Sequence, residues 1–150
     1  MKLTPLRLNL FLIYKIPLAF LSGTRVKFLN FDKSVVGVKY RWINQNPFRS
    51  MYWAVQGMAS ELSTGVLLMK YIKRSHRDVS MLVIGQKGSF MKKARGRITF
   101  TCLDGNLVKE AISKSISTGE PQKINMVSEG VDQDNNTVSK FEYQWSIKVK

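Results

Sequence analysis

The sequence has one cysteine and one histidine among its 150 residues. A single cysteine excludes an intrachain disulfide, and the two counts together exclude a cysteine-rich or multi-histidine metal site. We therefore expect no metal and no cofactor. Cys102 lies in the apolar run 98–103, which favours a buried structural thiol over the alternative, a reactive one. His76 lies in a polar cluster that indicates the end of a helix.

The sequence also lacks an uninterrupted run of about 20 apolar residues, so we expect no membrane span. Near the N-terminus, Lys15 and Pro17 interrupt an apolar run that superficially resembles a signal peptide. Helical spacing there favours an amphipathic helix, within residues 1–22, that packs on the domain; a cleaved signal is the alternative. The face expected to pack contains Leu3, Leu6, Leu10, Ile13 and Pro17, widened by Phe11 and Leu18.

Acidic residues are scarce in the first two thirds of the chain. Residues 1–103 carry eighteen Lys or Arg against three acids (Asp32, Glu61 and Asp78), and the formal net charge of the chain is +14. This charge indicates partners with phosphates, anionic surfaces or acidic substrates. We expect no nucleic-acid partner, because the basic residues alternate through predicted strands and turns without a recognisable nucleic-acid-binding motif.

The order of the predicted elements indicates a single α+β domain over residues 1–150. Alternating patterns predict a hairpin of strands 25–31 and 36–42, with Val36, Val38, Tyr40 and Trp42 on its buried face. Strands 81–91 and 97–103 are predicted to pair with each other across a basic turn, and a short helix over 107–117 follows. Strands 123–130 and 139–149 form the last predicted hairpin.

Residues 50–69 are the most informative segment. Met51, Val55, Met58, Leu62, Val66 and Met69 recur along one helical face, and the other faces carry mainly small or uncharged residues. A helix that is apolar or small on nearly all sides is enclosed by protein. Gly57 and Gly65 each lower the stability of such a helix by about 1 kcal/mol relative to alanine. Close approach of another backbone would justify this cost.

Glu61 is the only charged residue in this segment. A carboxylate on an enclosed helix is partly desolvated, so it is either paired with a cation or has a raised pKa. Both situations are common at active sites. A catalytic or binding role and a structural ion pair therefore both remain open for Glu61.

Several segments together resemble a known family. They are Asn46-Pro47-Phe48-Arg49-Ser50-Met51-Tyr52-Trp53, the run Ala59-Ser60-Glu61-Leu62-Ser63-Thr64-Gly65, residues 88–96 and residues 17–23. The chain resembles a domain-of-unknown-function branch of the hotdog superfamily, related to the phenylacetic-acid-type acyl-CoA thioesterases. The resemblance implies an antiparallel sheet wrapped around one long central helix. It also implies a homodimer, or a dimer of dimers, with sites at the subunit boundary.

The resemblance further implies a hydrolase acting on thioesters of coenzyme A or an acyl-carrier protein. We expect the protein to be cytoplasmic. Glu61 matches the acidic residue that acts as nucleophile or general base, while backbone amides at the helix N-terminus polarise the thioester carbonyl. Met51-Tyr52-Trp53 stands where such helices often begin with His-Gly-Gly. A non-catalytic module that binds an acyl or lipid-like ligand is the alternative function.

The expected substrate-binding residues are Asn46, Tyr52, Thr64, Lys92, Lys93 and Arg95. Asn46 precedes Pro47 at the helix entry, where its side chain either orients a ligand or caps the turn. Lys87, Lys92, Lys93, Arg95 and Arg97 form a basic run that contains no acid. This run is either a solvated surface or a site for the phosphates of coenzyme A or the acidic surface of a carrier protein.

Overall fold

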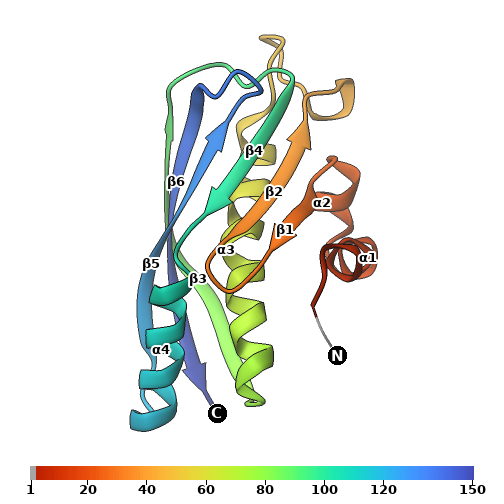
Figure 1. Cartoon of the computed structure of the whole chain (residues 1–150). Coiled ribbons are helices and arrows are strands. Elements are labelled where there is room, and N and C mark those ends of the chain that lie inside the picture. The colour runs from red at the N-terminus through yellow and green to blue at the C-terminus, as the bar shows by residue number, and fades with distance from the viewer. Residues whose placement is uncertain (1–2) are drawn as a thin grey trace.

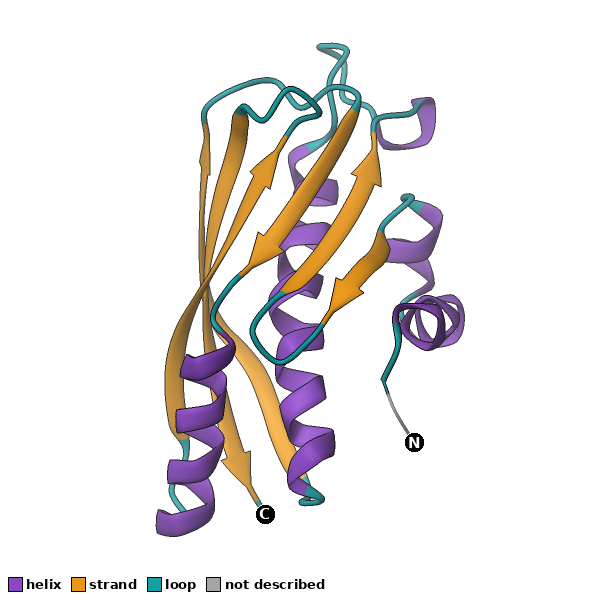
Figure 2. Ribbon diagram, viewed as in Figure 1, coloured by secondary structure: helices purple, strands orange, loops and turns teal. Residues whose placement is uncertain are grey.

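The computed structural model describes residues 3–150. Two short helices come first, and a long helix lies against one face of a curved sheet (Figures 1 and 2). The helices are α1 (Pro5–Lys15), α2 (Pro17–Leu21), α3 (Trp53–Ser75) and α4 (Gly105–Thr118), with a 3-10 turn at Trp42–Asn44. The strands are β1 (Arg25–Leu29), β2 (Ser34–Lys39), β3 (Val79–Phe90), β4 (Arg97–Cys102), β5 (Gln122–Val131) and β6 (Thr137–Val149).

The strands form one antiparallel sheet in the order β1-β2-β4-β5-β6-β3. The sheet curves around α3, and β1 and β3 are its edges (Figure 1). More than half of the α3 residues are buried, including Val55, Leu62 and Leu67. The expectation of an antiparallel sheet wrapped around a long central helix is confirmed.

The start of α3 lies three residues later than the pattern predicts. The backbone N–H of Met51 donates to Ala94 O (2.8 Å), and that of Tyr52 donates to Asn44 O (2.8 Å). These contacts hold residues 51–52 in an extended conformation, so helical hydrogen bonding begins after Tyr52. At the other end, the helix terminates before His76, whose backbone is left-handed with φ of 54°.

The predicted pairing of strands 81–91 and 97–103 is wrong. β3 pairs with β6 along its length, whereas β4 lies between β2 and β5. Residues 91–96 therefore cross from the edge of the sheet to its centre. Alternation identifies a strand and its buried face, but it does not identify the neighbouring strand. The first and last predicted hairpins, β1–β2 and β5–β6, are confirmed.

The predicted burial of Trp42 is also wrong. β2 ends at Lys39, and Trp42 begins the 3-10 turn, where its side chain is 82% exposed. Asn44 ends this turn and is buried, and its side chain donates to Lys39 O and Ser22 O. The hydrogen bonds of Asn44 therefore end the strand before the alternation in the sequence does.

The N-terminal segment is helical and packs on β1, but with a different face from the predicted one. Asn9 forms a paired hydrogen bond with the edge strand: its Nδ2 donates to Val26 O (3.0 Å), and Val26 N donates to its Oδ1 (2.8 Å). This pairing turns Leu8 and Leu12 inward. Of the predicted face, Leu6, Leu10, Ile13 and Leu18 are exposed. No helix in residues 3–150 is long and apolar enough to cross a membrane.

Candidate functional site

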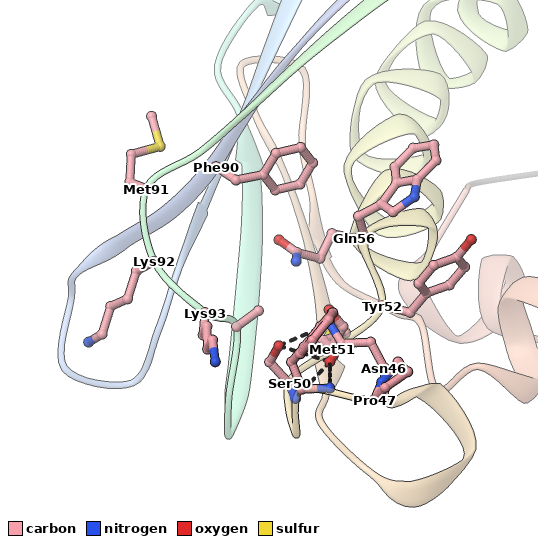
Figure 3. A pocket seen from close by; sticks show the side chains of 13 residues that line it. Asn46, Pro47, Ser50, Met51, Tyr52, Gln56, Phe90, Met91, Lys92 and Lys93 are labelled. Carbon is pink, nitrogen blue, oxygen red and sulfur yellow. Dashed lines mark hydrogen bonds between the residues drawn. The ribbon is translucent and has the colours of Figure 1, made fainter.

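A cleft of about 490 Å³ lies where the first turn of α3 faces the end of β3 (Figure 3). Its lining is mainly apolar. The residues around it are Asn46, Pro47, Phe48, Ser50, Met51, Tyr52, Trp53, Gln56, Phe90, Met91, Lys92, Lys93 and Ala94. The cleft therefore combines the loop before α3, the start of α3 and the connection between β3 and β4.

Asn46 organises the loop on one side of the cleft. Its Oδ1 accepts from Phe48 N (2.9 Å) and Ser50 N (3.2 Å), and its Nδ2 donates to Ser50 Oγ (3.0 Å). These hydrogen bonds, drawn in Figure 3, close a turn in which Arg49 adopts a positive φ of 57°. The Asn46 carboxamide thus holds the loop that forms one wall of the cleft.

The N-terminus of α3 opens into the same cleft. Tyr52 precedes the helix, and its side chain makes no hydrogen bond that caps it. Val55 N and Gln56 N donate to Tyr52 O (3.0 and 3.4 Å), whereas the N–H groups of Trp53 and Ala54 have no acceptor within residues 3–150. Such a helix end is a donor-rich, electropositive position that suits a negatively charged oxygen.

Gln56 is a polar cleft residue that the sequence reasoning missed. It is buried, and its Oε1 accepts a hydrogen bond from the Ser139 hydroxyl (2.7 Å). Its carboxamide points across the cleft (Figure 3), and Nε2 makes no hydrogen bond within the described part of the chain. The signal in the sequence is a glutamine one helical turn after Tyr52 in an otherwise apolar or small segment.

Glu61 lies further along α3 and does not line this cleft. It is half-buried, and within residues 3–150 its carboxylate makes no ion pair or hydrogen bond. Burial raises the pKa of Glu61 above its ordinary value. Of the two situations expected for this residue, the structure therefore contains the unpaired carboxyl with a raised pKa.

A polar network connects α3 with β6 next to Glu61. The hydroxyls of Ser60 and Tyr143 are 2.6 Å apart, and Tyr143 donates to Gly57 O (3.0 Å). Burial raises the pKa of Tyr143 to about 12; the Ser60 hydrogen bond opposes the rise and the Glu61 charge adds to it. The phenol therefore stays protonated at neutral pH and can serve as a donor.

The hydroxyl of Thr64 donates one hydrogen bond and accepts another inside the protein. It donates to Glu61 O (2.8 Å) and accepts from Trp145 Nε1 (3.0 Å), and the residue is buried. Thr64 therefore lies beside Glu61, one helical turn on, but it has no surface open to the cleft.

The basic run does not form one uniform patch. Lys92 forms an ion pair with Asp132 (2.8 Å), which holds the pKa of that carboxyl down at about 2. Lys93 lines both the main cleft and a second one of about 310 Å³, which also contains Arg95. The Nε of Arg95 donates to Arg49 O (2.9 Å). Lys87 and Arg97 lie outside both clefts.

The predicted site residues therefore fall into three groups. Asn46, Tyr52, Lys92 and Lys93 meet in the main cleft, and Arg95 lies in the adjoining one. Glu61 and Thr64 lie together, away from the cleft. Cys102 is fully buried beside Asp104, and burial raises the pKa of its thiol to about 12, which accords with the predicted structural thiol. In residues 3–150, no group of His, Cys, Asp or Glu is arranged to hold a metal ion.

Comparisons at the level of sequence identify no relative: no family model matches the chain, and no curated protein matches it. Solved structures do match. A Pseudomonas aeruginosa protein of unknown function, described as a "Probable Thioesterase", superposes with a TM-score of 0.82 at 19% identity, covering 99% of both chains. A Chlorobaculum tepidum protein with unknown function gives 0.83 at 13% identity, again over 99% of both chains.

A mutant thioesterase from Pseudomonas aeruginosa superposes with a TM-score of 0.73 at 10% identity, over 100% of this chain and 97% of that one. Identities this low carry information about the fold alone. The near-complete coverage of both partners means that the whole chain, including α1 and α2, has counterparts in these structures. The chain therefore has the hotdog fold, which it shares with proteins described as thioesterases.

Proposed function

We propose that the protein is a cytoplasmic thioesterase that hydrolyses an acyl thioester of coenzyme A or of an acyl-carrier protein. The observation that carries this proposal is Glu61: an unpaired, half-buried carboxyl with a raised pKa on the enclosed helix of a fold shared with thioesterases. A carboxylate held in this way is a stronger base than an exposed one.

The chemistry requires two things of the chain. Glu61 either attacks the thioester carbon as a nucleophile, or acts as the base that takes a proton from the attacking water. The open N–H groups at the start of α3 stabilise the negative charge that develops on the carbonyl oxygen. On the nucleophile route, Glu61 displaces the thiolate and water then hydrolyses the mixed anhydride; on the base route, water adds to the carbonyl carbon, gives its proton to Glu61, and the carbon–sulfur bond breaks. The thiolate takes up the proton that water released, so the products are the acid and the thiol. Gln56 Nε2, which projects into the cleft, supplies a further donor for the acyl carbonyl.

One protomer does not bring these groups together. Glu61 lies eight residues after Trp53, so the two are separated by about 12 Å along the helix axis. A second subunit would bring Glu61 close to an α3 N-terminus if the α3 helices of the two subunits lay antiparallel. β3 is a twelve-residue edge strand, and its outer edge has no strand partner in residues 3–150. This edge could therefore pair with β3 of a second subunit. We therefore propose a homodimer in which Glu61 of one protomer faces the α3 N-terminus of the other.

The basic residues beside the cleft support the choice of carrier. Lys93 lines the cleft and Arg95 lines the adjoining one, where they would contact the phosphates of coenzyme A or the acidic surface of a carrier protein. Lys92 contributes less charge, because Asp132 compensates it.

A non-catalytic acyl-binding module is the second candidate. It is favoured by one observation, the apolar lining of a cleft from which Glu61 is absent in the single chain. A panel of acyl-coenzyme A and acyl-carrier-protein thioesters separates the two functions. Thiol release with saturation by one chain-length class supports the enzyme. Tight binding of a non-hydrolysable thioether analogue, with no thiol release from any member of the panel, supports the binding module.

A further inference from the structure

The first two helices carry an apolar surface that nothing in the described chain covers. Figure 1 shows α1 and α2 together outside the edge strand β1. Their exposed side chains include Leu6 (71%), Tyr14 (81%) and Leu18 (68%). Leu10, Ile13 and Leu21 are also exposed, and together these six residues define the α1–α2 face. Leu6, Leu10, Ile13 and Tyr14 share one side of α1 by helical spacing, and an exposed apolar stripe of this kind marks an interaction site on a domain.

The charge around this face has one sign. Residues 1–31 contain five basic residues and no acid; the first acid in the chain is Asp32. Lys15 lies in the last turn of α1, and Arg25 and Lys27 lie on β1, the strand against which α1 packs. The basic groups at the margin of the face are Lys15, at the end of α1, and Arg25, whose guanidinium donates to Phe20 O and Thr24 O.

A groove of about 400 Å³ continues the face between α1 and α3. Leu10, Phe11 and Tyr14 line one side, and Met69 lines the other. Lys73 and Arg7 also line it, so its basic groups are adjacent to an apolar floor. This shape suits a hydrocarbon chain that carries an anionic headgroup.

We propose that the α1–α2 face docks the protein on the surface of an anionic lipid bilayer. Short helices with Leu, Phe and Tyr on one side and Lys or Arg at the margin bind in the interfacial region of such bilayers. The headgroups supply the negative charge that the face itself lacks. This inference does not depend on the thioesterase activity.

The same charge pattern disfavours a second copy of the chain as the occupant. In an isologous contact the face would meet itself. The basic margins of the two copies would then lie against each other without any acid from residues 1–31 to pair with them, and juxtaposed like charges oppose association.

Vesicle flotation with two variants tests the proposal. The face variant is Leu6→Ser with Leu18→Ser. The matched control is Leu103→Ser with Ile116→Ser, which removes two exposed apolar side chains from the β4–α4 connection and α4. All four side chains are exposed, so both variants should fold, as circular dichroism would verify. The vesicles contain either phosphatidylcholine alone or equal parts of phosphatidylcholine and phosphatidylglycerol.

We expect the parent and the control to bind the anionic vesicles, less strongly as salt rises, and to bind phosphatidylcholine weakly. The face variant should bind the anionic vesicles about tenfold more weakly or worse, because two inserted leucines are lost. Equal binding by all three proteins would overturn the proposal, since the net charge alone would then explain adsorption. So would no binding by the parent, or a face variant whose only change is a lower sedimentation mass, which would identify a second copy as the occupant.

Discussion

Glu61 affects stability as well as the proposed chemistry. Its pKa is raised in the folded chain, so the folded state retains a proton that the unfolded state loses first. The stability contributed by the protonated form is fully present below the unfolded pKa and is lost as pH rises through the folded pKa. At neutral pH the ionised carboxylate therefore destabilises the fold.

Replacing the carboxyl by a neutral amide should remove this penalty. We predict that Glu61→Gln unfolds at higher urea than the parent at neutral pH, and that the two midpoints converge near about pH 4, where the carboxyl of the parent is protonated. Urea titrations at both pH values measure the difference. A variant that is less stable than the parent at neutral pH would mean that the carboxylate has a stabilising partner.

Thr64 supports the same part of α3. Thr64→Val keeps the shape of the side chain but leaves Trp145 Nε1 without its acceptor. We expect a loss of about 1–3 kcal/mol in the free energy of unfolding, the cost of an unsatisfied buried donor. Thr64→Ser retains the hydroxyl and is the matched control. Thr64→Ser loses only the methyl group, so a Thr64→Val variant that is no less stable than Thr64→Ser would mean that the hydrogen bond from Trp145 contributes no stability.

Sequence reasoning found Glu61 because a lone charge in an apolar helix is visible in the chain itself. It missed Gln56 because the partner of that residue, Ser139, lies 83 positions away and only the folded sheet brings the two together. It expects Thr64 to bind substrate, but it does not reveal the hydrogen bonds of the Thr64 hydroxyl with Glu61 O and Trp145. Local pattern thus identifies an unusual residue, but not the distant groups that satisfy it.

Among the elements, α3 leaves one feature unexplained by a single protomer. A Cβ added at Gly57 would meet nothing closer than the Trp53 ring, at 4.0 Å, so the chain itself does not require glycine there. Close approach of a partner helix, as in the proposed dimer, would require it. Gly57 lies between Trp53 and Glu61 on one stripe of the helix.

Gly57→Ala should therefore affect assembly and not folding. We predict a soluble, helical protein whose dimer dissociation constant rises by about tenfold, because the added methyl group overpacks the contact between helices. Analytical ultracentrifugation measures the constant. The dimer dissociation constant could instead stay unchanged while the free energy of unfolding rises by about 1 kcal/mol, the gain that alanine brings to a helix. The partner subunit would then contact another part of the chain.

The connection between β3 and β4 carries a second prediction. Replacing Lys92 and Lys93 together with alanine should raise KM for a coenzyme A thioester by about three- to tenfold, with kcat nearly unchanged. Salt should reduce the effect, and a short thioester without the nucleotide should not be affected. Lys109→Ala with Lys114→Ala on α4 removes the same charge at a distance and is the control. Equal changes of KM in the two double variants would mean that the basic run acts only through the net charge of the protein.

The elements themselves were largely predictable, but their neighbours were not. Periodicity located α3, α4 and all six strands within a few residues. It paired β3 with β4 because they are consecutive, whereas the sheet places β6 beside β3. It also chose the wrong face of α1, because Asn9 pairs with the edge of β1 and so overrides the apolar stripe. Polar pairing with a sheet edge is a tertiary contact that helical spacing does not encode.

At the scale of the whole molecule, the proposed function rests on bringing together groups that one chain keeps apart. The open amides of α3 and the cleft lie at one end of the helix, and Glu61 lies about 12 Å further along. The shared fold and the open edge of β3 support an assembly of two chains that reunites them. We therefore propose that Glu61 is the residue that attacks the thioester or activates water.

Thiol release from the preferred acyl-coenzyme A thioester, by the parent and by Glu61→Gln at equal protein concentration, tests this claim most directly. The amide keeps the shape of the side chain but can act neither as base nor as nucleophile, so we predict that turnover falls by at least about a hundredfold. Circular dichroism and sedimentation should show an unchanged fold and assembly. Hydrolysis by the parent that persists undiminished in Glu61→Gln would contradict the account.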